Sequence, residues 1–131
     1  MDEDLRRHFD LLLEAELERL PPHLIELLDE APLLVEDHPS SQILAMMNIQ
    51  DPGALCGLYY GIPETHRSID HSAHMPEYIF LFRQGICRLS GCRAAGQNTA
   101  ELQRQIHITL LHEIGHHFGL DEDDLLDAGY G

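Results

Sequence analysis

Three histidines and a glutamate lie within six residues of the stretch HEIGHHFGL, which runs from 112 to 120. His112 and His116 are four residues apart. On a helix, four residues turn the chain through about 400°, so both imidazoles leave one face, one turn apart. Neutral imidazole is a good ligand for Zn²⁺. We therefore predict that His112 and His116 bind one zinc ion.

Glu113 and His117 occupy different positions around the same predicted helix. Glu113 lies to one side of the histidine pair, where it can accept a proton from a water molecule polarised by the metal without being a main ligand. His117 points about 140° away from His112 and cannot join the same site. We predict a catalytic role for Glu113 and a packing or supporting role for His117.

A catalytic zinc ion needs a third protein ligand and an open position for water. In the longer pattern H-E-x-x-H-x-x-G-x-x-H, the glycine turns the chain so that the last residue reaches the metal. Here Gly119 occupies the glycine position and Glu122 the last one. Because a carboxylate also binds zinc, we predict Glu122 as the third ligand and Asp121 as its alternative. The simpler interpretation of this acidic run is the start of another short helix, over 121–127.

The helix that carries the histidines is predicted to begin after Asn98 and to end at Phe118. Asn98 and Glu101 have the spacing of a capping pair, and Gly119 follows where a left-handed terminator is expected. Residues of one helix face recur every three or four positions between these ends: Leu102, Ile106, Thr109, Leu110, Ile114 and Phe118.

The rest of the chain alternates between predicted helices and strands. Helices are predicted over 4–20 and 22–29, and Ser40 or Ser41 could cap another over 43–48. The extended segments are a short strand over 33–35, a strand or loop over 58–62, and a strong strand over 78–83, where Gln84-Gly85 is predicted to turn into a further strand over 86–89. With no internal repeat or linker, this order predicts a single α+β domain over 1–131.

The composition is that of a globular protein, with 44% hydrophobic residues. Its net charge is −15, and all eight positive side chains are arginines. Such a charge repels phosphate backbones and anionic lipid, so we expect neither nucleic-acid nor membrane-surface binding. The N-terminal stretch MDEDLRRHFD has no basic and apolar regions like those of a secretory signal, so we expect a cytoplasmic protein.

Several other side chains are weaker candidates for chemistry. Three histidines in a polar stretch fit a second metal site or, more simply, titrating loop residues; they are His66, His71 and His74. Cys56, Cys87 and Cys92 are expected to be reduced thiols, with Cys87 and Cys92 as an alternative redox pair. Four further residues could contact an oxyanion or the acidic metal shell: Tyr59, Tyr60, Tyr130 and Arg67.

The stretch HEIGHHFGLDEDDL resembles the C-terminal motif of the small bacterial zincin-like metallopeptidases. Three upstream stretches are similar to other blocks of that family, in the same order: LERLPPHLIELLDEAPLLVEDHP, GLYYGIPETHRS and MPEYIFLFRQGI. Family members often carry aspartate at the position of Glu122, which supports this residue as a ligand. Two stretches depart from the family pattern, IDHSAHM and GICRLSGCRAAGQN, so we expect the rim of the substrate cleft to be particular to this protein.

The resemblance implies a compact, minimal zincin-like domain in which a small mixed sheet packs on the helix that carries HExxH. It also implies that the strand over 78–83 is exposed beside this helix, where an extended peptide adds to it by main-chain hydrogen bonds. The function expected is zinc-dependent hydrolysis of a peptide or protein substrate, with Glu113 as the base. The alternative is a non-catalytic interaction module stabilised by zinc. Glu113 favours the enzyme, because a purely structural site needs no base.

Overall fold

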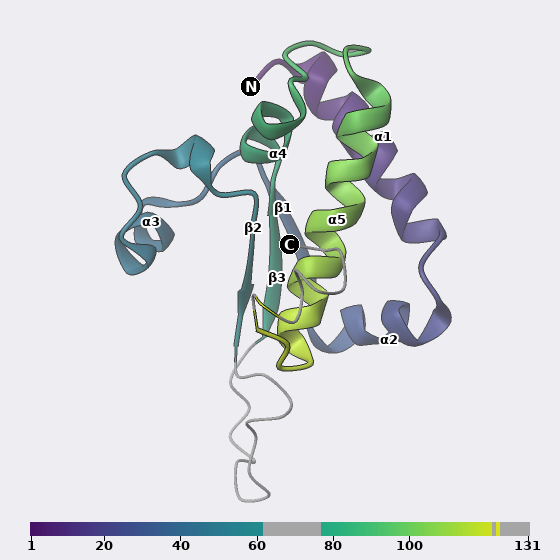
Figure 1. The fold of residues 1–131 in the computed structure, drawn as a ribbon, viewed down its shortest axis with the longest axis vertical. Helices are drawn as coiled ribbons and strands as arrows, with labels where there is room; N and C mark the ends of the chain where they lie inside the picture. Colours follow the sequence, from purple (N-terminus) through teal and green to yellow (C-terminus); the bar gives the residue numbers. More distant parts are fainter. Residues whose placement is uncertain (62–76, 122, 124–131) are drawn as a thin grey trace, which may run out of the picture.

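The computed structural model describes residues 1–61, 77–121 and 123. These parts form helices around a small sheet, which confirms the predicted α+β class (Figure 1). In chain order the elements are α1 (Glu3–Glu18), α2 (Pro22–Glu30), β1 (Leu33–Glu36), α3 (Ser41–Met47), η1 (Pro52–Ala54), β2 (Gly57–Tyr60), β3 (Tyr78–Phe82), α4 (Arg83–Ser90) and α5 (Thr99–His117). No helix in the described part of the chain is long and apolar enough to cross a membrane.

The sheet is mixed and has the strand order β1-β3-β2. β1 runs parallel to β3, with Leu33 opposite Ile79, and β2 runs antiparallel to it, with Gly57 opposite Leu81. The strong strand predicted from the sequence is therefore the central strand. The expectation that it is exposed and open to an added peptide is wrong, because β1 and β2 occupy both of its edges. The central position gives the apolar segment YIFLF more burial than an edge position would. The edge strand of the sheet that packs against α5 is β2.

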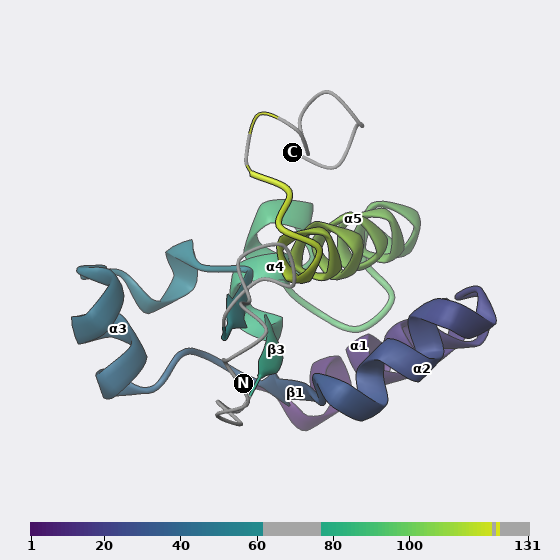
Figure 2. The same ribbon diagram turned by 90° about the horizontal axis from the view of Figure 1, so that it is seen from below.

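One face of the sheet carries the main core. Ile79 and Leu81 of β3 point to this face and are fully buried. α5 packs on β2 and β3, and α1 lies against α5, whereas α3 lies on the other side of the sheet (Figures 1 and 2). The predicted apolar stripe of α5 lies in this core, and its buried members are Leu102, Ile106, Leu110 and Ile114. The stripe therefore orients α5 so that the adjacent side of the helix, with His112, Glu113 and His116, faces the cleft beside β2.

The segment after β3 is the helix α4, not the predicted turn and second strand. The buried residues Ile86, Cys87 and Ser90 have helical spacing, and the Ser90 hydroxyl donates to the Ile86 carbonyl at 2.6 Å. Gly85 serves a close approach rather than a turn, because a Cβ atom there would lie 2.2 Å from the Leu55 carbonyl oxygen. Gly91, with φ of 70°, ends the helix. The sequence of a short apolar segment is compatible with either a strand or a buried helix, and here tertiary packing determines that the segment is a helix.

The ends of the other helices, including α5, lie close to their predicted positions. Ser40 is the N-cap of α3, where its hydroxyl accepts a hydrogen bond from the Ile43 amide at 3.2 Å. At the start of α5, Asn98 is the N-cap residue and Glu101 the third helical residue, as predicted, but the Asn98 side chain does not make the predicted capping hydrogen bond. Asn98 has a left-handed backbone with φ of 45°, and its side-chain amide donates to the Gly91 carbonyl at 3.0 Å instead. The Glu101 carboxylate accepts from Arg104 on the exposed side of the helix.

Arginine–aspartate pairs join α1 to the sheet. Arg83 donates to Asp10 at 2.8 Å and to Asp37 at 3.0 Å, and Arg6 donates to Asp37 at 2.6 Å. The Arg6 hydrogen bond, followed by that of Arg83, lowers the pKa of Asp37 to about 2. These contacts hold α1 at the end of β1 and β3, and α1 in turn supports α5 through Phe9 and Leu13.

Candidate metal centre

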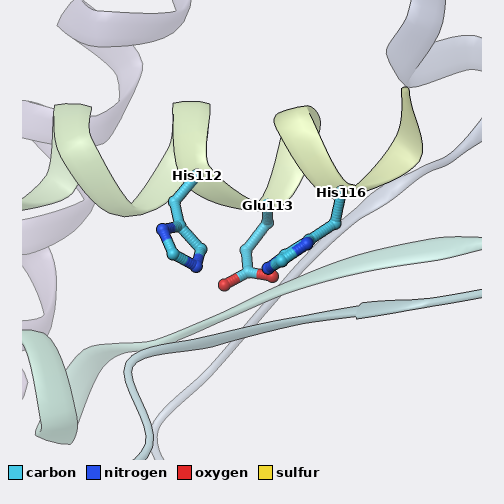
Figure 3. Close-up of side chains that lie close together, drawn as sticks. All are labelled: His112, Glu113 and His116. Carbon is cyan, nitrogen blue, oxygen red and sulfur yellow. The ribbon is translucent and has the colours of Figure 1, made fainter. Parts of the chain in front are cut away.

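His112, Glu113 and His116 leave the same side of α5 and point toward the sheet (Figure 3). Their metal-binding atoms, one from each residue, all lie within 4.8 Å of one another. The two imidazole rings meet edge-on, with their centroids 4.8 Å apart, and the Glu113 carboxylate lies next to them and is buried, with 7% of the residue exposed. The spacing of the two histidines thus has the geometric result predicted for a helix.

The turn that ends α5 orients the His116 ring. His116 Nδ1 lies 3.0 Å from the Leu120 carbonyl oxygen. Because a carbonyl only accepts hydrogen bonds, Nδ1 carries the hydrogen in this contact, and Nε2 carries the lone pair that a metal would use. Gly119 adopts the predicted left-handed conformation, with φ of 81°, and the amide of Leu120 donates to the Gly115 carbonyl at 3.1 Å. The turn thereby gives His116 one defined tautomer.

His117 lies on another side of α5, in agreement with its predicted packing role. It is buried, with 2% exposed, and its ring meets the Tyr59 ring edge-on at 5.9 Å. His117 Nδ1 lies 3.7 Å from a carboxylate oxygen of Glu77, and the Tyr59 hydroxyl donates to the other at 3.1 Å. Sequence analysis missed Glu77, since a single acid before a strand carries no signal of burial. This contact network joins α5 to β2 and to the start of β3.

A cleft of about 610 Å³ runs between β2 and α5 and contains the His-Glu-His group. Cys56, just before β2, lines it, and sequence analysis assigned no role there to this residue. Burial, and then the nearby Glu113 carboxylate, raise the pKa of the Cys56 thiol.

Gly57 sets the closest approach between β2 and α5. A Cβ atom at this position would lie 2.9 Å from Thr109 Cγ2, 3.0 Å from Glu113 Cγ and 3.0 Å from the Phe80 carbonyl oxygen. Real Cβ atoms essentially never approach another atom as closely as the 2.9 Å contact, and contacts of 3.0 Å are tighter than most real Cβ contacts. The absence of a side chain at Gly57 therefore allows the Glu113 side chain to pack directly against the strand.

We expect Gly57→Ala to lower the free energy of unfolding by about 1–3 kcal/mol, because the added methyl group overpacks the contact between β2 and α5. Urea denaturation measures the loss. The double variant Gly57→Ala/Thr109→Ser removes the Cγ2 atom that the new methyl would meet, so it should recover part of the stability. Unchanged stability in the single variant would show that the two elements can separate without cost.

The remaining predicted residues do not gather at this site. Asp121 lines the cleft, but Glu122 lies outside the described residues, as do His66, His71, His74, Arg67 and Tyr130 and most of the helix predicted over 121–127. Tyr60 is half-exposed and borders a groove between the other face of the sheet and α3. Of the described candidates for metal binding, catalysis or oxyanion contact, the cleft is lined by His112, Glu113, His116, Asp121 and Tyr59.

Cys87 and Cys92 are buried thiols that form no disulfide. Burial, followed by the neighbouring Cys92, raises the pKa of Cys87 to about 12. The Cys92 thiol donates to the Ala94 carbonyl at 3.3 Å. A thiol with so high a pKa is a weak nucleophile, which favours a packing role over a redox role.

Comparison with known proteins identifies the family. The model of the zincin-like metallopeptidase family matches residues 28–130, which include the whole sheet and α5. A search of curated proteins found no match. The matched family and the His-Glu-His group together indicate a metal site on α5. The chain belongs to the zincin-like metallopeptidase family.

Proposed function

We propose that this protein is a zinc-dependent peptidase in which His112, His116 and Glu122 hold the metal and Glu113 is the general base. One observation carries the proposal: a buried carboxylate lies next to two imidazoles of the same helix, and the metal-binding atoms of all three residues lie within 4.8 Å of one another inside a cleft. A metal site that only stabilised the fold would have no use for this carboxylate.

The residues present fit zinc. Two neutral imidazole nitrogens and a carboxylate are a common ligand set for catalytic zinc, which keeps a fourth position open. The His116–Leu120 hydrogen bond supports this assignment, because a second contact of this kind orients metal-binding histidines. When bound, zinc supplies Lewis acidity, which polarises a peptide carbonyl and makes water in its coordination sphere more acidic.

Glu113 performs the proton transfers in this proposal. Its carboxylate accepts a proton from a water molecule as the water oxygen attacks the peptide carbonyl carbon. The same proton then passes to the amide nitrogen while the C–N bond breaks, so that an acid and an amine leave the cleft. The close contact of Glu113 Cγ with Gly57 limits movement of the base.

The peptide is proposed to bind along β2. One edge of β2 pairs with β3, and the cleft beside α5 is lined by Cys56, Gly57, Leu58 and Tyr59. An extended peptide that adds to this edge through main-chain hydrogen bonds would cross the His-Glu-His group. This position replaces the edge of the central strand β3, which is already paired.

Zinc dependence of cleavage tests the function. We expect the zinc-loaded protein to cut members of a diverse peptide mixture, as detected by mass spectrometry. Chelation should abolish the cleavage, and added zinc should restore it. If the protein binds zinc, loses thermal stability when the metal is removed and cuts no peptide, the non-catalytic module replaces the peptidase.

The third ligand is tested by comparing neighbouring acids. We expect Glu122→Ala to weaken zinc binding by about 100-fold or more, because a catalytic zinc site needs three protein ligands. Asp121→Ala and Asp123→Ala are the matched controls and should each have a smaller effect. Zinc affinity is measured by competition with a chelator of known affinity. If Asp121→Ala has the largest effect, the ligand lies one residue earlier than proposed.

A further inference from the structure

We propose that the cleft binds a large apolar side chain of the substrate peptide in the part that lies beyond His112, toward the start of α5. We call this part the apolar arm and define it by Met47, Leu55, Leu89 and Ile108. The inference rests on the proposed peptidase function, since it assigns the class of substrate that the same cleft takes.

α5 determines how far the apolar arm extends from the metal site. Gln105, Ile108 and His112 line the cleft at the three- and four-residue spacing of one helix face. At about 1.5 Å per residue, the seven steps from Gln105 to His112 span roughly 10 Å along the helix. An extended peptide advances roughly 3.3 Å per residue, so the arm accommodates about three residues on one side of the scissile bond.

The far wall of the apolar arm consists of α4 and the segment before β2. Gly85 brings α4 against the backbone at Leu55, and Leu89 lies one turn further along the same helix. Arg88 forms an ion pair of 2.6 Å with Asp51 just before η1. The wall is therefore built by a packed helix and the segment that it holds, and it can present a defined surface to a peptide.

The side chains of the apolar arm favour an apolar ligand. Leu89 is 61% exposed and Met47 is 40% exposed, although both are large apolar residues. Two described carboxylates line the cleft. Glu113 lies at the metal site and Asp121 lies beyond it, at the end of the cleft away from the apolar arm, so no described carboxylate lines the arm itself. A charged side chain would lose hydration in the arm without gaining a partner, whereas an apolar side chain would cover Leu89 and Met47.

A matched series of peptides tests the inference. Each peptide differs at one position within three residues of the cleavage site and carries Leu, Phe, Ala, Asp or Arg there. For the zinc-loaded protein, we expect kcat/KM at one such position to be about 10-fold or more higher for Leu or Phe than for Ala or Asp. Leu89→Glu should reduce this preference by about 10-fold and improve cleavage of the Arg peptide. Leu11→Glu, which changes a leucine of 60% exposure on α1, is the control and should leave the preference unchanged.

Binding to the zinc-loaded Glu113→Gln variant separates failure of the inference from failure of the proposed function. Calorimetry with the same peptides measures affinity without cleavage. Cleavage without a preference for Leu or Phe, or a preference that Leu89→Glu leaves unchanged, would overturn the apolar arm and leave the peptidase in place. Absence of cleavage by the natural sequence, together with tighter binding of the Leu and Phe peptides, would overturn the peptidase and support the arm as a peptide-binding surface.

Discussion

Replacing Glu113 with glutamine is expected to lower the rate of peptide cleavage by about 100-fold or more, while zinc content and folding stay close to those of the natural sequence. Glutamine keeps the size and polarity of the side chain in its buried position next to Gly57. It cannot accept the proton of the attacking water. The effect therefore falls on the transition state, where the proton moves, and little on the bound metal.

The measurements for Glu113→Gln are kcat/KM on a cleaved peptide, elemental analysis and thermal unfolding. Glu18→Gln is a matched control, because Glu18 is exposed at the end of α1 and is not among the residues that line the cleft. It should leave kcat/KM unchanged. Undiminished cleavage by Glu113→Gln would refute the proposed mechanism even in a protein that is a peptidase.

Replacing His112 or His116 with alanine is expected to remove the bound zinc, whereas His117→Asn should retain it. The two ligands supply converging nitrogens from one face of α5, and two remaining ligands hold zinc poorly. His117 contacts Glu77 and Tyr59 on another face. Its replacement should instead reduce stability by about 1–3 kcal/mol, because the buried Glu77 carboxylate loses a partner.

Elemental analysis after mild dialysis should find about one zinc per chain in the natural sequence and in His117→Asn. The same analysis should find almost none in His112→Ala and His116→Ala. Circular dichroism in the presence of excess zinc shows whether each variant is folded. Equal loss of zinc from all three folded variants would mean that His117 is also a ligand and that the proposed ligand set is wrong.

The sequence by itself determined the features that depend on local periodicity. The spacing of Leu102, Ile106, Leu110 and Ile114 predicts both the helix and its buried face. The side on which His112, Glu113 and His116 lie then follows from helix geometry alone. Gly119 likewise predicts the left-handed turn, because few other residues adopt that backbone conformation. These features extend over one or two helical turns, so neighbouring residues are sufficient to specify them.

Tertiary structure decided the features that depend on contacts between distant segments. The sequence predicted Gly85 as a turn residue, but in the structure it lies in the helix α4, where it packs closely against the backbone of Leu55. β3 became the central strand because its apolar residues gain more burial between two partners than at an edge, and this moved the proposed peptide site to β2. Glu77 meets His117 only after β3 and α5 have packed. Such contacts leave no periodic pattern in the sequence, because the residues that meet are far apart along the chain. Even Tyr59 and Glu77, which form a hydrogen bond, are separated by 18 residues.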